Sequence, residues 1–218
     1  MIAEPTTLLT DYALAGVTAW LAWSLVRAGE GQRSRALWSL AFAALALAAA
    51  LGGTWHGFAP AFAPIAVILV WKATVLCVGI ASFGMLAGTA VSTTAGNARK
   101  TLVAIAAAKL AVYSGWMVGH SEYIYVIADT GTALVLIAAL HLWSAARDRA
   151  SRWILAGVGV SVLAAGVQAS GFALHRHFNH NDLYHVIQVA AMFLFWAGVK
   201  RLRDRDPSAA PAREGRTP

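Results

Sequence analysis

Charged side chains are scarce in this sequence. Only 12% of the 218 residues are Asp, Glu, Lys or Arg, whereas 59% are hydrophobic. A soluble domain carries about 25% charged and roughly 45–50% apolar residues. The few charges stand in short clusters between long uncharged runs, which is the pattern of membrane spans and loops. The composition therefore excludes an ordinary water-soluble domain and favours a protein embedded in lipid.

Cysteine is nearly absent too, and a cleavable signal peptide is not evident. The single cysteine, Cys77, excludes an intramolecular disulfide, and its apolar surroundings predict a buried structural thiol. Residues 1–11 lack a basic start and contain Glu4 and Asp11. We therefore expect the first apolar segment to stay in the mature protein and to direct insertion.

Long apolar segments are what the sequence has in abundance. Each is long enough to cross a hydrocarbon core of roughly 30 Å as a helix, and none shows the alternation of a membrane barrel strand. The segments are 9–27, 36–58, 64–90, 101–118, 123–145, 152–173 and 182–200. They predict an all-α polytopic membrane protein, a seven-transmembrane helix bundle over residues 1–205. Residues 206–218 are predicted to be a disordered cytoplasmic tail.

The loops of this predicted bundle are short, and small residues recur in two of its segments. Short loops predict that neighbours in sequence pack as antiparallel neighbours. The small residues of 43–53 and 156–166 would let helix backbones approach closely.

The basic residues gather on one side of this predicted bundle. The positive-inside rule places that side in the cytoplasm and the N-terminus outside, in a membrane such as the inner (plasma) membrane of a bacterium. It also explains the net charge of +7 without nucleic acid as a partner. The basic side holds Arg27, Arg33, Arg35, Arg99, Lys100, Arg147, Arg149, Arg152, Lys200, Arg201, Arg203, Arg205, Arg213 and Arg216, and the other side holds Arg176 alone.

Histidine is concentrated at the predicted outer face. Only His141 lies near the cytoplasmic end, where a histidine in the last helical turn can interact favourably with the helix dipole. Glu122, Asp129 and Asp182 also lie on the outer side. The outer histidines are His56, His120, His175, His177, His180 and His185. An asymmetry of this kind points to a functional site at the outer end.

The stretch from His175 to His185 is the densest polar segment. Asn181 or Asp182 can cap the seventh helix, which places His185 about one turn inside it and Gln188 one turn further on the same face. A buried imidazole needs a polar partner. His56, His185 and one loop histidine could bind a metal ion, and three histidines with an open water position form a catalytic zinc site.

Simpler interpretations of the same residues stay open. His120, His175 and His177 are typical of loop histidines facing water, and His56 of an interfacial histidine bonded to a backbone carbonyl. Asp182 is typical of a helix cap. The nearby Asp11 can simply reach water at the outer end of the first span.

An acid and two lysines lie inside the predicted spans. Asp129 in the fifth span can be a proton relay, a general base or a carboxylate that orients a ligand histidine. Lys72 and Lys109 can extend toward the membrane surface or pair with an acid.

Two short segments in a seven-span chain resemble the CREST superfamily of membrane hydrolases, which includes the alkaline ceramidases and the progestin and adipoQ receptors. His56 resembles the histidine of that family's second-helix motif, and His185 in Tyr-His-Val-Ile resembles the second histidine of its seventh-helix motif. The resemblance implies three zinc-binding histidines and a zinc-bound water that attacks a lipid amide or related bond.

The sequence departs from that family pattern at three places. Gly52 replaces the second-helix serine, Asn181 replaces the first histidine of the seventh helix, and the third span has no acid. His180, one position before Asn181, can still reach inward, and Asp129 can replace the missing acid from another helix.

These observations predict a zinc-dependent membrane hydrolase that acts on a lipid-like amide or ester at the outer side. The predicted site residues are Asp129 as the catalytic general base or a carboxylate that orients a ligand, His56, His180 and His185 as metal ligands (with His177 or His175 as alternatives for the third), and Asp182, Gln188, Asn181 and His177 as supporting groups.

Non-enzymatic functions remain as alternatives. The first is a membrane protein that senses metal or pH, or binds a ligand, through its histidine cluster. The second is a haem protein with His56 and His185 as axial ligands. A transporter is disfavoured, because the sequence shows neither an inverted repeat nor paired Gly/Pro-broken helices.

Overall fold

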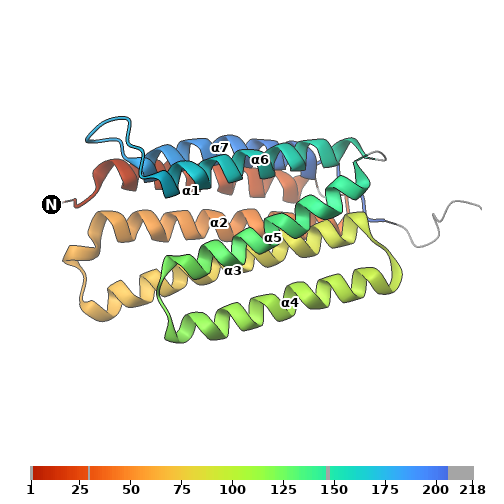
Figure 1. The fold of residues 1–218 in the computed structure, drawn as a ribbon, viewed down its shortest axis with the longest axis horizontal. Helices are drawn as coiled ribbons and strands as arrows, with labels where there is room; N and C mark the ends of the chain where they lie inside the picture. The colour runs from red at the N-terminus through yellow and green to blue at the C-terminus, as the bar shows by residue number, and fades with distance from the viewer. Residues whose placement is uncertain (1, 29, 146–147, 206–218) are drawn as a thin grey trace, which may run out of the picture.

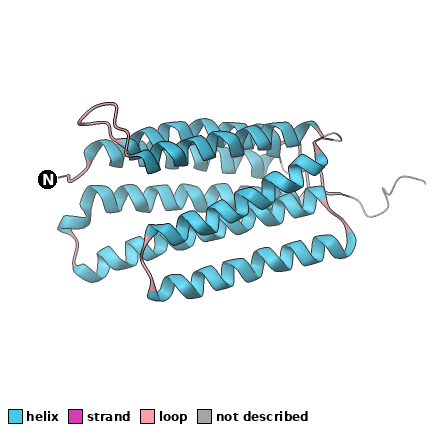
Figure 2. Cartoon of the chain, viewed as in Figure 1, coloured by secondary structure: helices cyan, strands magenta, loops and turns pink. Residues whose placement is uncertain are grey.

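The structure, a computed structural model, describes residues 2–28, 30–145 and 148–205. In these residues it contains seven α-helices and no β-strand (Figures 1 and 2). The helices are α1 (Pro5–Arg27), α2 (Arg33–Phe58), α3 (Pro64–Thr93), α4 (Gly96–Gly119), α5 (Tyr123–Ser144), α6 (Arg149–Ser170) and α7 (His180–Val199), with a short 3₁₀ turn, η1 (Ala59–Ala61), after α2. The all-α fold predicted from the sequence is confirmed. The tail 206–218 and Arg147 lie outside the described residues.

Each of the seven helices is long and apolar enough to cross a membrane. Local sequence signals explain several of their ends. Pro5 and Pro64 occupy the first positions of α1 and α3, where a missing N–H removes no helical hydrogen bond. The carboxylate of Asp148 accepts a hydrogen bond from the backbone N–H of Ala150 at the start of α6, and Gly171, with φ +68°, ends that helix.

Six of the helices form a closed ring in the order α1, α2, α3, α5, α6, α7, with α1 packed against α7. α4 lies outside this ring and packs mainly on α3 (Figure 1). Neighbours in sequence are therefore neighbours in space except for α4 and α5, which touch only slightly. The prediction that every consecutive pair packs together is wrong at this one connection, because α3 takes the place beside α5.

The main hydrophobic core lies toward one end of the ring. Its largest members, such as Leu25, Trp38, Phe42, Ile154 and Phe195, come from the C-terminal halves of α1 and α7 and the N-terminal halves of α2 and α6. We call the other end, where α1, α3, α5 and α7 begin, the histidine end. A second, smaller cluster lies nearer the histidine end and consists of Val75, Tyr113, Met117 and Val126.

Small residues bring helices together as the sequence predicts. A Cβ atom added to Gly53 of α2 would lie 2.8 Å from the Cβ of Asp11 on α1, and one added to Gly157 of α6 would lie 2.7 Å from the ring of Phe195 on α7. Both distances are too short for a real contact, so these positions require glycine. Cys77 on α3, predicted to be buried, is only half-buried.

Candidate functional site

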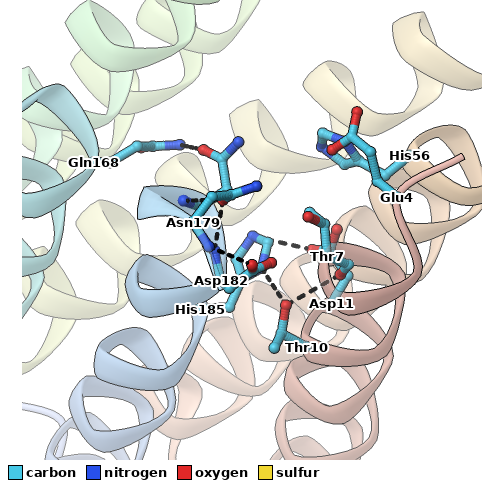
Figure 3. A network of polar contacts seen from close by, with 10 residues as sticks. Glu4, Thr7, Thr10, Asp11, His56, Gln168, Asn179, Asp182 and His185 are labelled. Carbon is cyan, nitrogen blue, oxygen red and sulfur yellow. Dashed lines mark hydrogen bonds and ion pairs between the residues drawn. The ribbon is translucent and has the colours of Figure 1, made fainter. Parts of the chain in front are cut away.

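A buried pair of titratable side chains joins the first and last helices at the histidine end. Nε2 of His185 on α7 lies 3.2 Å from Oδ1 of Asp11 on α1, and Nδ1 of the same ring lies 3.0 Å from the hydroxyl oxygen of Thr10 (Figure 3). Asp11 is 5% exposed and His185 is 8% exposed. The expectation that Asp11 reaches water is therefore wrong, because α7 and α2 cover it.

The start of α7 fixes the position of His185. Asn179 caps the helix by accepting hydrogen bonds from the backbone N–H groups of Asn181 and Asp182, and the Asp182 carboxylate accepts one from the Asn179 N–H at 2.7 Å. This reciprocal arrangement is a capping box. The predicted cap, Asn181 or Asp182, is thus corrected to Asn179, with Asp182 as its partner inside the helix.

The hydrogen bonds around His185 account for its protons. The Thr10 hydroxyl has one proton to donate and lies 3.1 Å from the carbonyl oxygen of Thr7 and 3.0 Å from Nδ1 of His185. When that proton goes to Thr7, Nδ1 of His185 donates to Thr10. The contact between Nε2 and Asp11 then holds one proton, either on the ring as an ion pair or on the carboxyl as a neutral pair. The Asp11–His185 pair is therefore a place where a proton can be held or exchanged.

Two carboxylate oxygens, one within this pair and one close to it, are buried without a hydrogen-bond donor. They are Oδ2 of Asp11 and Oδ1 of Asp182, which is only 1% exposed. Gln188 donates to the Ser161 hydroxyl at 3.3 Å, while its own carbonyl oxygen also has no donor. Buried acceptors of this kind are rare in folded proteins and call for a partner such as water, an ion or a ligand.

His56 occupies a separate position at the same end. Its Nδ1 lies 3.0 Å from a carboxylate oxygen of Glu4, and both side chains are partly exposed to the surface. Figure 3 shows this pair apart from the Asp11–His185 pair. The partner of His56 is thus the Glu4 carboxylate and not the backbone carbonyl that an interfacial histidine was predicted to bond.

The remaining predicted site residues lie at the entrance of α7. His180 is its first residue and half-buried, and Asn181 accepts a hydrogen bond from the side chain of Gln168 on α6 at 3.1 Å. His175 and His177 lie in the exposed loop before α7. They face the surface, as loop histidines are predicted to do.

The sequence predicts that His56, His180 and His185 bind a zinc ion. Across residues 2–28, 30–145 and 148–205, no three His, Cys, Asp or Glu side chains are grouped so that they could hold a metal ion. His56 and His185 each contact a different carboxylate, and His180 is the first residue of α7. In this arrangement the three histidines do not fit a zinc site.

Asp129, the predicted general base, belongs to another buried cluster. The ammonium group of Lys109 on α4 lies 2.5 Å from Oδ1 of Asp129 on α5 and donates to the Ser82 hydroxyl on α3 at 2.8 Å. The sequence left open whether Lys109 pairs with an acid, and the structure pairs it with Asp129. This ion pair ties α4 to the ring, and Oδ2 of Asp129 is left without a donor.

The turn between α4 and α5 binds the other lysine of the spans, which is half-buried. The ammonium group of Lys72 on α3 donates to the backbone carbonyls of Met117 and His120. Glu122, the N-cap residue of α5, accepts a hydrogen bond from the Ser121 N–H at 2.8 Å. Hydrogen bonds from the backbone N–H groups of Glu122 and Ser121 lower the pKa of the Glu122 carboxyl, and nearby His120 and Lys72 act in the same direction.

His141 lies in the last turn of α5, near the other end of the ring. Its ring bridges Thr89 on α3 at 3.4 Å and Ser151 on α6 at 2.9 Å, and it is fully buried. Its neighbours are hydroxyl groups, so it serves as a polar tie among three helices.

A large apolar cavity lies inside the ring, next to the Asp11–His185 pair. Its volume is about 490 Å³, within the range of roughly 300–1,000 Å³ typical of small-molecule sites. A smaller cavity of about 120 Å³ contains Asp11 and His185. The two cavities share the lining residues Leu45, Val78, Tyr123, Tyr184, Gln188 and Met192. A polar centre thus adjoins the end of an apolar chamber.

The large cavity reaches the outer surface of the bundle between α5 and α6. Its lining includes Ile127 and Val135 of α5 and Val162 of α6, whose side chains are 48%, 68% and 59% exposed. Along α5 the lining extends from Tyr123 to Ala138, about 22 Å at 1.5 Å per residue. The chamber is therefore long, apolar and open at the side.

Sequence reasoning missed Asp11 and Thr10 as site residues. One signal was available: Asp11 stands six positions after the start of α1 and His185 five positions after the start of α7, and both helices begin at the same end. Equal depth on helices of the same direction would have placed the two side chains at one level. That α1 and α7 are adjacent could not be read from one sequence.

Comparison with known proteins identifies the family of the chain. Residues 6–204 match the model of a family of unknown function (DUF6962), and the chain belongs to that family. No curated protein and no solved structure matches it. The family description carries no activity, so the resemblance to the CREST superfamily stays a prediction.

Proposed function

We propose that this protein spans a membrane and binds a lipid-like amphiphile that enters sideways from the bilayer. The apolar chain of the ligand would occupy the cavity between α5 and α6, and its polar group would lie at the Asp11–His185 pair. The observation that carries this proposal is that the side-open apolar chamber and the smaller cavity with the buried polar pair share six lining residues. Both the length of the chamber and its opening suit a single alkyl chain better than a compact water-soluble ligand.

The orientation of the protein in the membrane follows from its charges. The basic residues of the loops would face the cytoplasm, which places the histidine end outside. The exposed aliphatic side chains of α5 and α6 would then contact lipid, so the chamber would open to the hydrocarbon region. A polar centre just inside the outer interface would meet the polar group of an amphiphile at its natural depth.

A photoreactive amphiphile tests this proposal directly. The probe is hexadecanol with a diazirine in its chain, added to protein in phosphatidylcholine nanodiscs, irradiated, and mapped by peptide mass spectrometry. We expect adducts on cavity residues of α5 and α6. Labelling spread evenly over the lipid-facing surfaces, with no enrichment at the cavity, would refute the proposal.

A cavity-filling variant provides the matched comparison. Gly131 of α5 lines the cavity, and a Cβ at this position would meet no atom within 4 Å, so Gly131→Trp can place its ring in the chamber. Gly159 of α6 has equal free space but does not line the cavity, and it serves as the control. We expect Gly131→Trp to lower cavity labelling at least tenfold and Gly159→Trp to leave it unchanged.

Zinc-dependent hydrolysis of an amide or ester, which the resemblance implies, remains a prediction. Zinc binding by His56 and His185 would require both rings to leave their carboxylate partners. Its test is metal analysis of untagged protein beside His56→Ala and His185→Ala. About one zinc per chain that is lost in both variants would establish the site, and metal-free wild type would refute it. A coloured protein would instead indicate the haem alternative.

A further inference from the structure

The polar centre has a charge imbalance that defines the ligand more closely. Asp11 and Asp182 are both almost completely buried, and each has one carboxylate oxygen with no donor. Figure 3 shows Asp182 and His185 close together on α7, with Asp11 facing them from α1. His185 can neutralise at most one of the two carboxylates, since its ring carries a single positive charge. A second positive charge, with N–H or O–H donors, is what the site lacks.

No lysine or arginine of the described residues bonds to these oxygens, and His56 is engaged with Glu4. Lys72 is engaged by the carbonyls of Met117 and His120, and Lys109 by Asp129 and Ser82. Arg176 lies in the exposed loop before α7. A charge buried without a partner is costly, so the missing cation must come from a ligand or the site must take up a proton.

The cavity indicates what kind of cation fits. Asp11 lines the smaller cavity together with the rings of Tyr123 and Tyr184, which also line the long apolar chamber. Aromatic faces attract a cation, and carboxylate oxygens attract its N–H groups. A metal ion needs at least three ligands held together, which the described residues do not gather. A primary ammonium group, in contrast, brings its own three donors.

We infer that the ligand of this site is a single-chain amphiphile with a protonated primary amine, whose ammonium group donates a hydrogen bond to Oδ2 of Asp11, close to the second buried carboxylate of Asp182, while its alkyl chain fills the chamber between α5 and α6. This inference rests on the proposed amphiphile binding and specifies its ligand class. It makes the two carboxylates the residues that select the head group, and the chamber the element that accepts the chain.

Competition against the photoreactive hexadecanol probe tests the head group. Unlabelled hexadecylamine, hexadecanol, hexadecanoate and hexadecyltrimethylammonium are added to wild-type protein in the same nanodiscs. We expect hexadecylamine to reduce cavity labelling at a concentration at least tenfold lower than hexadecanol, and hexadecanoate to compete least. Hexadecyltrimethylammonium carries the charge but no N–H group, so we expect it to compete less well than the amine.

Variants assign this preference to the carboxylates. Asp11→Asn and Asp182→Asn are expected to reduce the advantage of hexadecylamine over hexadecanol to about twofold or less. Glu4→Gln removes a negative charge at a partly exposed position of the same end. We expect this variant to keep the full advantage of hexadecylamine over hexadecanol. Continued labelling of each variant by the photoreactive hexadecanol shows that its cavity is still formed.

The outcomes separate the two proposals. If wild-type protein is labelled in the cavity but hexadecanol competes as well as hexadecylamine, the ammonium assignment is refuted while amphiphile binding stands. If the two cationic probes compete equally, hydrogen bonding by the ammonium is refuted. If the cavity is not labelled at all, amphiphile binding itself fails.

Discussion

His185 on the last helix lies 3.2 Å from Asp11 on the first, and this contact closes the ring of helices at the histidine end. Both residues are buried, and Thr10 takes the remaining ring nitrogen of His185. The relationship has two consequences. It couples the packing of α1 on α7 to the protonation of one pair, and it places that pair at the head of the apolar chamber.

The effects of breaking this pair from its two sides should not add. Asp11→Leu and His185→Leu each leave a buried polar partner, so we expect each to lower the free energy of unfolding by about 3–5 kcal/mol. The double variant should lose less than the sum of the two. Reversible unfolding in detergent, analysed as a double-mutant cycle, measures this coupling.

The exposed pair of Glu4 and His56 provides the control for that cycle. Its side chains are partly open to the surface, so a coupling of no more than about 1 kcal/mol is expected. Equal coupling in the two pairs, or strict additivity for Asp11 and His185, would contradict the buried interaction described above.

Lys109 should hold α4 on the ring. Lys109→Met leaves Asp129 buried without its cation, so we expect faster hydrogen exchange of the α4 amides and a lower thermal midpoint. Adding Asp129→Leu should restore part of the protection, because no unpaired charge then remains. Hydrogen–deuterium exchange with mass spectrometry resolves the effect on α4.

Lys100, near the start of the same helix, is exposed and serves as the matched control. Lys100→Met should leave α4 exchange near the wild-type rate. If Lys109→Met also left it unchanged, the ion pair would not be what secures α4, and its packing on α3 would suffice.

The helices could be predicted from the sequence because their signal is local. Apolar length, flanking charges and residues such as Pro5, Pro64 and Gly171 fix where each helix begins or ends within its own segment. The position of α4 outside the ring could not be predicted this way. It depends on α3 packing against α5, a contact between helices that are not consecutive.

The candidate site was predictable only in part, for the same reason. His185 and Asp182 were singled out because they are polar residues at the start of an apolar helix. The partner of His185 was not, because Asp11 stands more than 170 positions away in the chain. The predicted grouping of His56 with His185 assumed that equal depth implies contact, whereas each ring faces its own carboxylate.

Glu122 should give the α4–α5 turn a dependence on pH. Backbone N–H groups hold the pKa of its carboxyl below the ordinary value of 4.5, so the folded state favours the ionised form. The stabilisation is then fully present above pH 4.5 and is lost as the pH falls below that value. We expect Glu122→Ala to lower the thermal midpoint at neutral pH and to match wild type in acid.

The comparison with Glu122→Gln isolates the charge. Glutamine keeps a hydrogen-bond acceptor at the N-cap but does not titrate, so the gap between Glu122→Gln and Glu122→Ala should not change with pH. A gap between wild type and Glu122→Ala that stayed constant from neutral to acid pH would show that ionisation of this carboxyl has no part in stability.

Gly84 should be among the positions least tolerant of a side chain. A Cβ at this residue of α3 would lie 2.7 Å from the backbone carbonyl oxygen of Leu37 on α2, which cannot move without shifting the helix. We expect Gly84→Ala to lower the free energy of unfolding by roughly 1–3 kcal/mol through overpacking. Gly159→Ala meets nothing within 4 Å and should be neutral or slightly stabilising, since alanine favours a helix more than glycine. Unfolding of both variants side by side in one detergent gives the measurement. A Gly84→Ala protein as stable as Gly159→Ala would mean that α2 and α3 can separate at no cost, and that their close contact is not what fixes the ring.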